Sequence, residues 1–270
     1  MPSFISGWSS VSLAKYLFMF ICLPWFGSTI YQSFPSLQFP FMNNLHAADK
    51  IEMVELLHGV NPQWVVIWLH GLGADGNDFV PIVPDLGLPE SVSVKFLFPH
   101  APVRPITING GMQMRGWYDI KSMDLINRED EAGVLESEQI VQGIIEQQIG
   151  QGIPAENIIL AGFSQGGAIA LHAGLRSQHR LAGVIALSTY IPMINTFADN
   201  LSAANTETPI FMAHGESDPV VSAELGLKSK NLLEKLGYGV EWNTYPMPHS
   251  VSAEEITAIG HWLKNRFNAN

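Results

Sequence analysis

The sequence predicts an α/β domain in which a mostly parallel central sheet is flanked by helices. Short apolar runs alternate along the chain with longer segments whose apolar residues recur at helical spacing, as in parallel sheets with crossover helices. A Gly-Phe-Ser-Gln-Gly stretch at 162–166 lies between one such run and one such segment. With 270 residues, the chain is long enough for one large domain of this class.

The first 50 residues differ from the rest of the chain. An apolar stretch at 16–26 matches a signal-peptide core in length, but it is shorter than the roughly 20 residues that span a bilayer. Only Lys15 supplies positive charge before it, and Met42 offers a second start. The segment is interpreted as an over-extended start, as a cleaved signal or amphipathic anchor, or as ordered structure. We assign residues 1–50 to an N-terminal extension and residues 51–270 to the main domain.

The first strands of this domain follow from its apolar patterns. Residues 51–58 alternate apolar and polar side chains, which is typical of an edge strand. Residues 64–69 are continuously apolar, as in a strand buried on both faces, and residues 92–98 form another strand. Residues 101–119 contain an Asn-Gly-Gly turn between alternating apolar residues, which predicts a hairpin.

The later elements alternate between helix and strand. Residues 133–150 carry Val and Ile at helical spacing and lead to the strand that precedes the Gly-Phe-Ser-Gln-Gly stretch. Further strands are predicted at 181–188, 209–215 and 240–245, and further helices at 222–236 and 252–267. The helix at 222–236 is expected to bury Leu225, Leu232, Leu233 and Leu236. The last helix starts at a Ser-x-x-Glu capping box.

Ser164 has the position of a nucleophile. A serine at the apex of a strand-turn-helix has a strained backbone and leaves no room for a Cβ two residues away on either side, where Gly162 and Gly166 stand. The following helix directs free N–H groups at the same place, where they can stabilise an oxyanion. The bare motif occurs by chance in roughly one chain in ten. The apolar strand before it and the helix-forming residues after it give it weight.

A serine at neutral pH needs a base within hydrogen-bond reach and a third group that orients the base. On parallel sheets these partners lie on loops at the carboxyl ends of later strands. Asp218 and His249 follow two later predicted strands, which gives the chain order Ser, Asp, His, with Glu216 as the alternative acid. His172 and His261 are disfavoured as the base because they lie inside predicted helices. Chain order disfavours His70 and His214 as the base, but their place at strand ends leaves open that they shape the site.

Two further features complete the predicted site. The turn at 70–76 is rich in glycine and follows the buried strand at 64–69, so its backbone N–H groups can face a ligand. We predict an oxyanion hole made by the N–H groups of Leu72 and Gln165. The side chains interpreted as the lining of an apolar substrate groove, with core packing as the alternative, are Met112, Met114 and Trp117.

Composition argues against several other functions. The formal net charge is −11 with only 14 Lys and Arg, which argues against binding to nucleic acid or to anionic membranes. Cys22 is the only cysteine, so no internal disulfide can form, and no Cys/His cluster has zinc spacing. We therefore expect no zinc site of this kind and no stable membrane span.

These residues together resemble the phospholipase/carboxylesterase family of α/β-hydrolases, which includes acyl-protein thioesterases and small bacterial carboxylesterases. The resemblance covers roughly residues 51–267 and is carried by the motifs at 70–76, 117–119, 162–167, 214–220 and 248–250. It implies an α/β-hydrolase fold and hydrolysis of carboxylic esters or thioesters through an acyl-enzyme, with no metal or cofactor. The N-terminal extension and Thr189-Tyr190 depart from the family pattern.

The expected substrate is a small-molecule acyl ester or thioester, lysophospholipids included. Short intervals between elements leave no room for a large lid domain, which predicts an open groove that favours short to medium acyl chains. A peptidase or lactone hydrolase of the same fold, and a binding protein without activity, are the alternatives. The expected location is cytoplasmic, or exported or membrane-associated if residues 1–41 belong to the native protein, and a homodimer is left open.

Overall fold

The computed structural model describes residues 51–122, 125 and 129–268. The predicted N-terminal extension and Cys22 lie outside these residues. Among the helices within them, none combines the length and the apolar character needed to cross a membrane.

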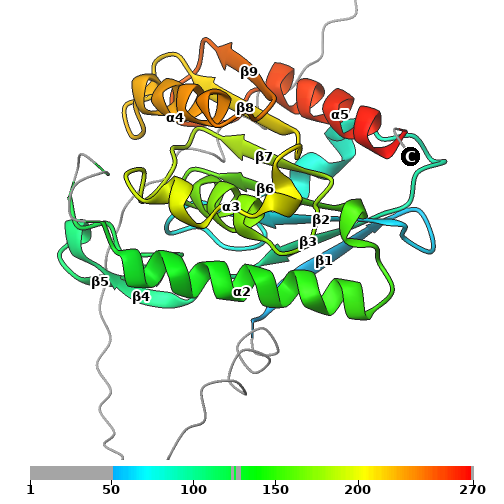
Figure 1. Cartoon of the computed structure of the whole chain (residues 1–270), viewed down its shortest axis with the longest axis horizontal. Coiled ribbons are helices and arrows are strands. Elements are labelled where there is room, and N and C mark those ends of the chain that lie inside the picture. Colours follow the sequence, from blue (N-terminus) through cyan, green and yellow to red (C-terminus); the bar gives the residue numbers. More distant parts are fainter. Residues whose placement is uncertain (1–50, 123–124, 126–128, 269–270) are drawn as a thin grey trace, which may run out of the picture. The chain divides into compact units, whose positions relative to one another are not determined.

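Seven strands form one sheet in the order β1-β3-β2-β6-β7-β8-β9 (Figure 1). Their bounds are β1 (Met53–His58), β2 (Trp64–Leu69), β3 (Val94–Pro99), β6 (Ile158–Phe163), β7 (Gly183–Leu187), β8 (Ile210–Gly215) and β9 (Val240–Tyr245). Only the edge strand β1 is antiparallel to its neighbour, and every other pair in this sheet is parallel. The predicted mostly parallel sheet is confirmed.

Helices cover both faces of this sheet, and each face has its own hydrophobic core. The α-helices are α2 (Glu131–Gly150), α3 (Gln165–Arg176), α4 (Ala223–Lys235) and α5 (Ala253–Phe267). Buried residues of α2, α3 and α4 join one core, and those of α5 and of the short helix η2 (Val80–Leu86) join the other. Side chains of β2 alternate between the two cores, which explains why this strand is apolar throughout.

The predicted hairpin is confirmed as a separate two-stranded antiparallel sheet. It consists of β4 (Val103–Ile106) and β5 (Met112–Arg115), joined through the short helix η3 (Thr107–Asn109). Gly110 and Gly111 turn the chain with φ values of 66° and 80°, a left-handed conformation that glycine adopts without strain. The Arg115 carbonyl accepts a hydrogen bond from Gly73 N at 2.8 Å, so the hairpin is attached to the loop that follows β2.

The last two helices confirm one expectation and correct another. At the start of α5, Ser252 and Glu255 form both hydrogen bonds of the predicted capping box. In α4, Leu233 is buried, but the expectation that Leu236 is buried was wrong, because Leu236 is 37% exposed. The helix ends at Lys235, so Leu236 lies beyond its last turn and no longer on the buried face.

Candidate active site

Ser164 lies between β6 and α3 with φ 54° and ψ −120°, the strained conformation that its motif predicts. The glycines around it are required by close backbone contacts. A Cβ on Gly162 would lie 2.3 Å from the Gly166 carbonyl oxygen, and one on Gly166 would lie 2.2 Å from the Leu69 carbonyl oxygen. These contacts require a tight turn, and in a turn of this type the serine hydroxyl projects from the end of the strand.

Asp218 and His249, which follow β8 and β9, meet beside this turn. His249 Nδ1 donates a hydrogen bond to Asp218 Oδ2 at 2.6 Å. The other carboxylate oxygen accepts hydrogen bonds from the backbone N–H groups of Val220 and Val221 at 2.8 and 2.9 Å. Burial alone would raise the pKa of Asp218, but these hydrogen bonds and the charge of the imidazole outweigh burial and hold the pKa below its ordinary value. Asp218 is therefore ionised at neutral pH and can orient His249.

The His249 ring packs on the residue that precedes the candidate nucleophile. The centroids of the Phe163 and His249 rings are 4.7 Å apart. Because Nδ1 is bonded to Asp218, Nε2 is the nitrogen left to accept a proton. The alternative acid, Glu216, instead accepts a hydrogen bond from Thr244 Oγ1 at 3.1 Å and is exposed, so the geometry favours Asp218.

The loop after β2 lies against Ser164. A Cβ on Gly71 would be 3.6 Å from the Ser164 Cβ. His70 holds this loop, because its Nε2 accepts a hydrogen bond from Ala101 N at 3.0 Å and its Nδ1 donates one to the Gly71 carbonyl at 2.7 Å. Burial lowers the pKa of His70 to about 4, so the ring is neutral and can accept and donate at once. Leu72, a predicted oxyanion donor, therefore lies in a fixed loop beside the nucleophile.

Two residues have side-chain contacts that the sequence did not specify. Gln165 was predicted to act only through its backbone N–H, but its side chain also forms hydrogen bonds with the backbone of Trp117 and Tyr118. His214 is buried, donates to the Val221 carbonyl at 2.9 Å and lies 3.6 Å from Asp218 Oδ2. Burial lowers the pKa of His214, so a neutral ring packs against the carboxylate. The only sign of these contacts in the sequence is that His214 stands at the end of a predicted strand and Gln165 at the start of a predicted helix.

The predicted groove residues have different environments. Met112 is 41% exposed on the hairpin, and Met114 lies close to the loop after β2, with its sulfur 3.8 Å from where a Cβ on Gly73 would be. The expectation that Trp117 lines a groove does not fit its complete burial, and the alternative of core packing describes it. Its indole Nε1 donates a hydrogen bond to the His70 carbonyl at 2.9 Å.

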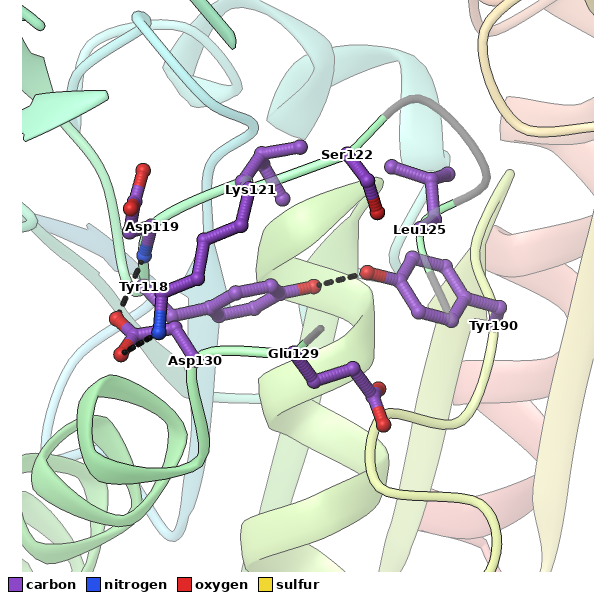
Figure 2. A pocket seen from close by; sticks show the side chains of 9 residues that line it. Tyr118, Asp119, Lys121, Ser122, Leu125, Glu129, Asp130 and Tyr190 are labelled. Atoms are coloured by element: carbon purple, nitrogen blue, oxygen red, sulfur yellow. Dashed lines mark hydrogen bonds and ion pairs between the residues drawn. The ribbon is translucent and has the colours of Figure 1, made fainter. Parts of the chain in front are cut away.

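A small cavity lies next to Tyr118 and Tyr190 (Figure 2). Its lining consists of Tyr118, Asp119, Ile120, Lys121, Ser122, Leu125, Glu129, Asp130 and Tyr190. The hydroxyls of Tyr118 and Tyr190 point toward each other at 3.0 Å, and burial raises the pKa of both groups. None of the predicted catalytic or groove residues lines this cavity, so it is distinct from the candidate active site.

Comparisons with known proteins find a family model and several relatives that match most of the described residues. The family model described as Phospholipase/Carboxylesterase matches residues 52–266. An acyl-protein thioesterase 1 of Neurospora crassa is 46% identical over 210 residues, which cover 74% of this chain and 86% of that protein. A probable carboxylesterase of Oryza sativa subsp. japonica is 36% identical over 208 residues, covering 76% and 78% respectively. The crystal structure of Arabidopsis thaliana SOBER1 matches with a TM-score of 0.72 and 34% identity, covering 76% of this chain and 99% of that one.

Proposed function

This chain belongs to the phospholipase/carboxylesterase family of α/β-hydrolases, and from this premise we propose how it hydrolyses its substrates. It is a serine hydrolase of esters or thioesters. We assign Ser164 as the nucleophile, His249 as the base and Asp218 as the group that orients the base. The observation that carries this assignment is the 2.6 Å contact between Asp218 and His249 beside the strained turn at Ser164.

The proposed reaction begins when His249 Nε2 takes the proton of Ser164 as its Oγ attacks the acyl carbon. The oxygen of the tetrahedral intermediate gains the negative charge and accepts hydrogen bonds from the N–H groups of Leu72 and Gln165. His249 then gives the proton to the leaving oxygen or sulfur, which departs as an alcohol or a thiol. The acyl group remains on Ser164 as an ester.

Water completes the proposed cycle. His249 takes a proton from a water molecule as the water oxygen attacks the acyl carbon. The second tetrahedral intermediate uses the same two N–H donors. It collapses by releasing the carboxylic acid, and Ser164 regains its proton from His249.

We propose short to medium acyl esters as the preferred substrates, with thioesters and lysophospholipids included. The hairpin beside the loop after β2 has strands of only four residues each, which supports an open groove rather than a deep tunnel. The exposed side chain of Met112 on this hairpin is available to an acyl chain. Thioesters enter the proposal because several relatives are named acyl-protein thioesterase 1.

The experiment is a rate profile over p-nitrophenyl esters and matching acyl thioesters of increasing chain length, with Ser164→Ala alongside. We expect a maximum at short to medium chains and no hydrolysis above background by the variant. Rates that rise steadily to long chains would overturn the chain-length proposal. Intact mass after exposure to a fluorophosphonate should show one adduct on the wild type and none on Ser164→Ala, and an adduct on the variant would exclude Ser164 as the nucleophile.

A further inference from the structure

The side chain of Gln165 connects the start of α3 to a segment 47 and 48 residues earlier in the chain. Its Oε1 accepts a hydrogen bond from Trp117 N at 2.7 Å, and its Nε2 donates one to the Tyr118 carbonyl at 2.6 Å. Gln165 is 3% exposed, so both bonds are shielded from water. A buried amide that satisfies two backbone groups of another segment holds that segment at a fixed distance.

The segment held by Gln165 in turn carries the loop after β2. Trp117 donates its indole N–H to the His70 carbonyl at 2.9 Å. The Leu72 side chain also lies against Gly116, where an added Cβ would be 2.9 Å from a Leu72 methyl group. The loop with the first proposed oxyanion donor therefore rests on residues 116–117, which Gln165 positions.

We propose that the Gln165 side chain is a positioning residue that sets the separation between the two oxyanion donors. One donor, Leu72 N–H, is on the loop after β2, and the other is the N–H of Gln165 itself at the first residue of α3. The connection runs from the Gln165 amide through Trp117 to His70. This inference rests on the proposed function, in which both N–H groups bind the oxyanion.

The chemistry of the bridge accounts for glutamine at this position. The bridge needs one acceptor for Trp117 N–H and one donor for the Tyr118 carbonyl, and an amide supplies both. Leucine supplies neither. An ionised glutamate has only acceptors and would repel the Tyr118 carbonyl, whereas a protonated glutamate has a C=O acceptor and an O–H donor and restores both bonds.

Steady-state kinetics of Gln165→Leu provide the first test. We expect kcat to fall by about tenfold to a hundredfold with KM within about threefold, because removing an oxyanion donor outright costs about 10²–10³ in kcat and displacing one costs less. The effect should fall on kcat because the oxyanion exists in the transition state and not in the bound substrate.

Asn205 offers a matched control for the loss of a buried amide. Its side chain is also buried and bridges backbone groups, but at the opposite end of the sheet, before β7 and β8: Leu181 N, Ser177 O and His179 O. We expect Asn205→Leu to lower Tm and to leave the kcat of the folded protein within about twofold of the wild type.

The pH dependence of Gln165→Glu provides the second test. Its kcat relative to the wild type should be greatest at low pH and fall as pH rises, because burial raises the pKa of the carboxyl group and ionisation then breaks the bridge. The ratio for Asn205→Asp should stay flat. Gln165→Leu should show a low ratio that does not change with pH, which separates lost hydrogen bonds from repulsion by a charge.

The outcomes distinguish this inference from the proposed function. A Gln165→Leu enzyme with kcat within about twofold of the wild type would overturn the positioning role, while loss of turnover in Ser164→Ala would uphold the serine mechanism. If Gln165→Leu does not fold, a ratio for Gln165→Glu that does not fall with pH would overturn the role instead. A wild type that is inactive, or a Ser164→Ala variant as active as the wild type, would refute the proposed function itself.

Discussion

At the residue scale, hydrogen-bond partners distinguish the two carboxylates that could orient His249. Two carboxylates follow β8, but Asp218 bonds His249 while Glu216 bonds Thr244. The backbone bonds from Val220 and Val221 also fix the orientation of the Asp218 carboxylate, so it presents one oxygen to the base. The sequence favoured Asp218 over Glu216 as the acid, and the hydrogen bonds of the two carboxylates support the same choice.

Asp218→Asn should lower kcat by up to about 10⁴-fold, because an amide does not hold His249 in the tautomer that accepts the serine proton. Steady-state hydrolysis of a short p-nitrophenyl ester measures this loss. Glu216→Gln is the matched control and should keep kcat within about twofold of the wild type. Equal losses in the two variants would contradict the assignment of Asp218.

His70 gives a prediction about stability and pH. Burial lowers its pKa from 6.5 to about 4, so between these values the unfolded chain binds more protons at this residue than the native state does. The contribution of His70 to stability is therefore complete above pH 6.5 and is lost as pH falls toward about 4, a change of about 3 kcal/mol.

The measurement is the free energy of unfolding by urea between about pH 7 and about pH 4. His70→Gln, whose amide oxygen can still accept the Ala101 N–H, should show a shallower fall than the wild type. His261→Gln changes an exposed histidine of α5 and should leave the curve unchanged. Parallel curves for the wild type and His70→Gln would disprove the role of His70.

At the element scale, the strand-turn-helix around Ser164 depends on contacts between backbones. β6 and α3 approach so closely at Gly162 that an added Cβ would lie within 3 Å of three backbone atoms of Gly166 and Gly167. These atoms cannot move aside as the end of a flexible side chain could. The spacing of the glycines in the sequence reflects this contact.

Gly162→Ala should lower Tm markedly and reduce turnover, because either β6 or α3 must shift to accept the methyl group. Thermal unfolding and kcat of the folded fraction are the measurements. The matched control is Gly150→Ala at the end of α2, where an added Cβ meets nothing within 4 Å. That control should be neutral or stabilising by up to about 1 kcal/mol, and equal effects of the two changes would refute the steric argument.

At the scale of the whole molecule, the parallel sheet brings the proposed site together. β2, β6, β8 and β9 all point the same way, so the loops that follow them meet at one edge of the sheet. Each part of the proposed site follows a different one of these strands: the loop with Leu72, the nucleophile, the acid and the base.

We therefore predict that a chain of residues 51–270 folds and hydrolyses short acyl esters with the kcat of the full chain. This segment contains the residues of both described cores, and the family model matches residues 52–266 within it. The measurements are Tm and kcat of the two proteins. A shortened chain that fails to fold would show that the extension is part of the folding unit.

The sequence by itself determined the features that depend on local pattern and on the order of elements. The apolar runs predicted the strands, and the glycines around Ser164 predicted the strained turn, because both are dictated by residues close together in the chain. The order of residues along the chain then predicted Ser164, Asp218 and His249 as nucleophile, acid and base.

The tertiary structure alone decided the features that depend on contacts between distant segments. It buried Trp117 beneath the loop after β2 instead of in a groove, it exposed Leu236, and it placed the Gln165 side chain on the backbone of Trp117 and Tyr118. Side-chain burial and hydrogen bonding between residues 47 and 48 positions apart depend on how the elements pack together, and no local pattern encodes that packing.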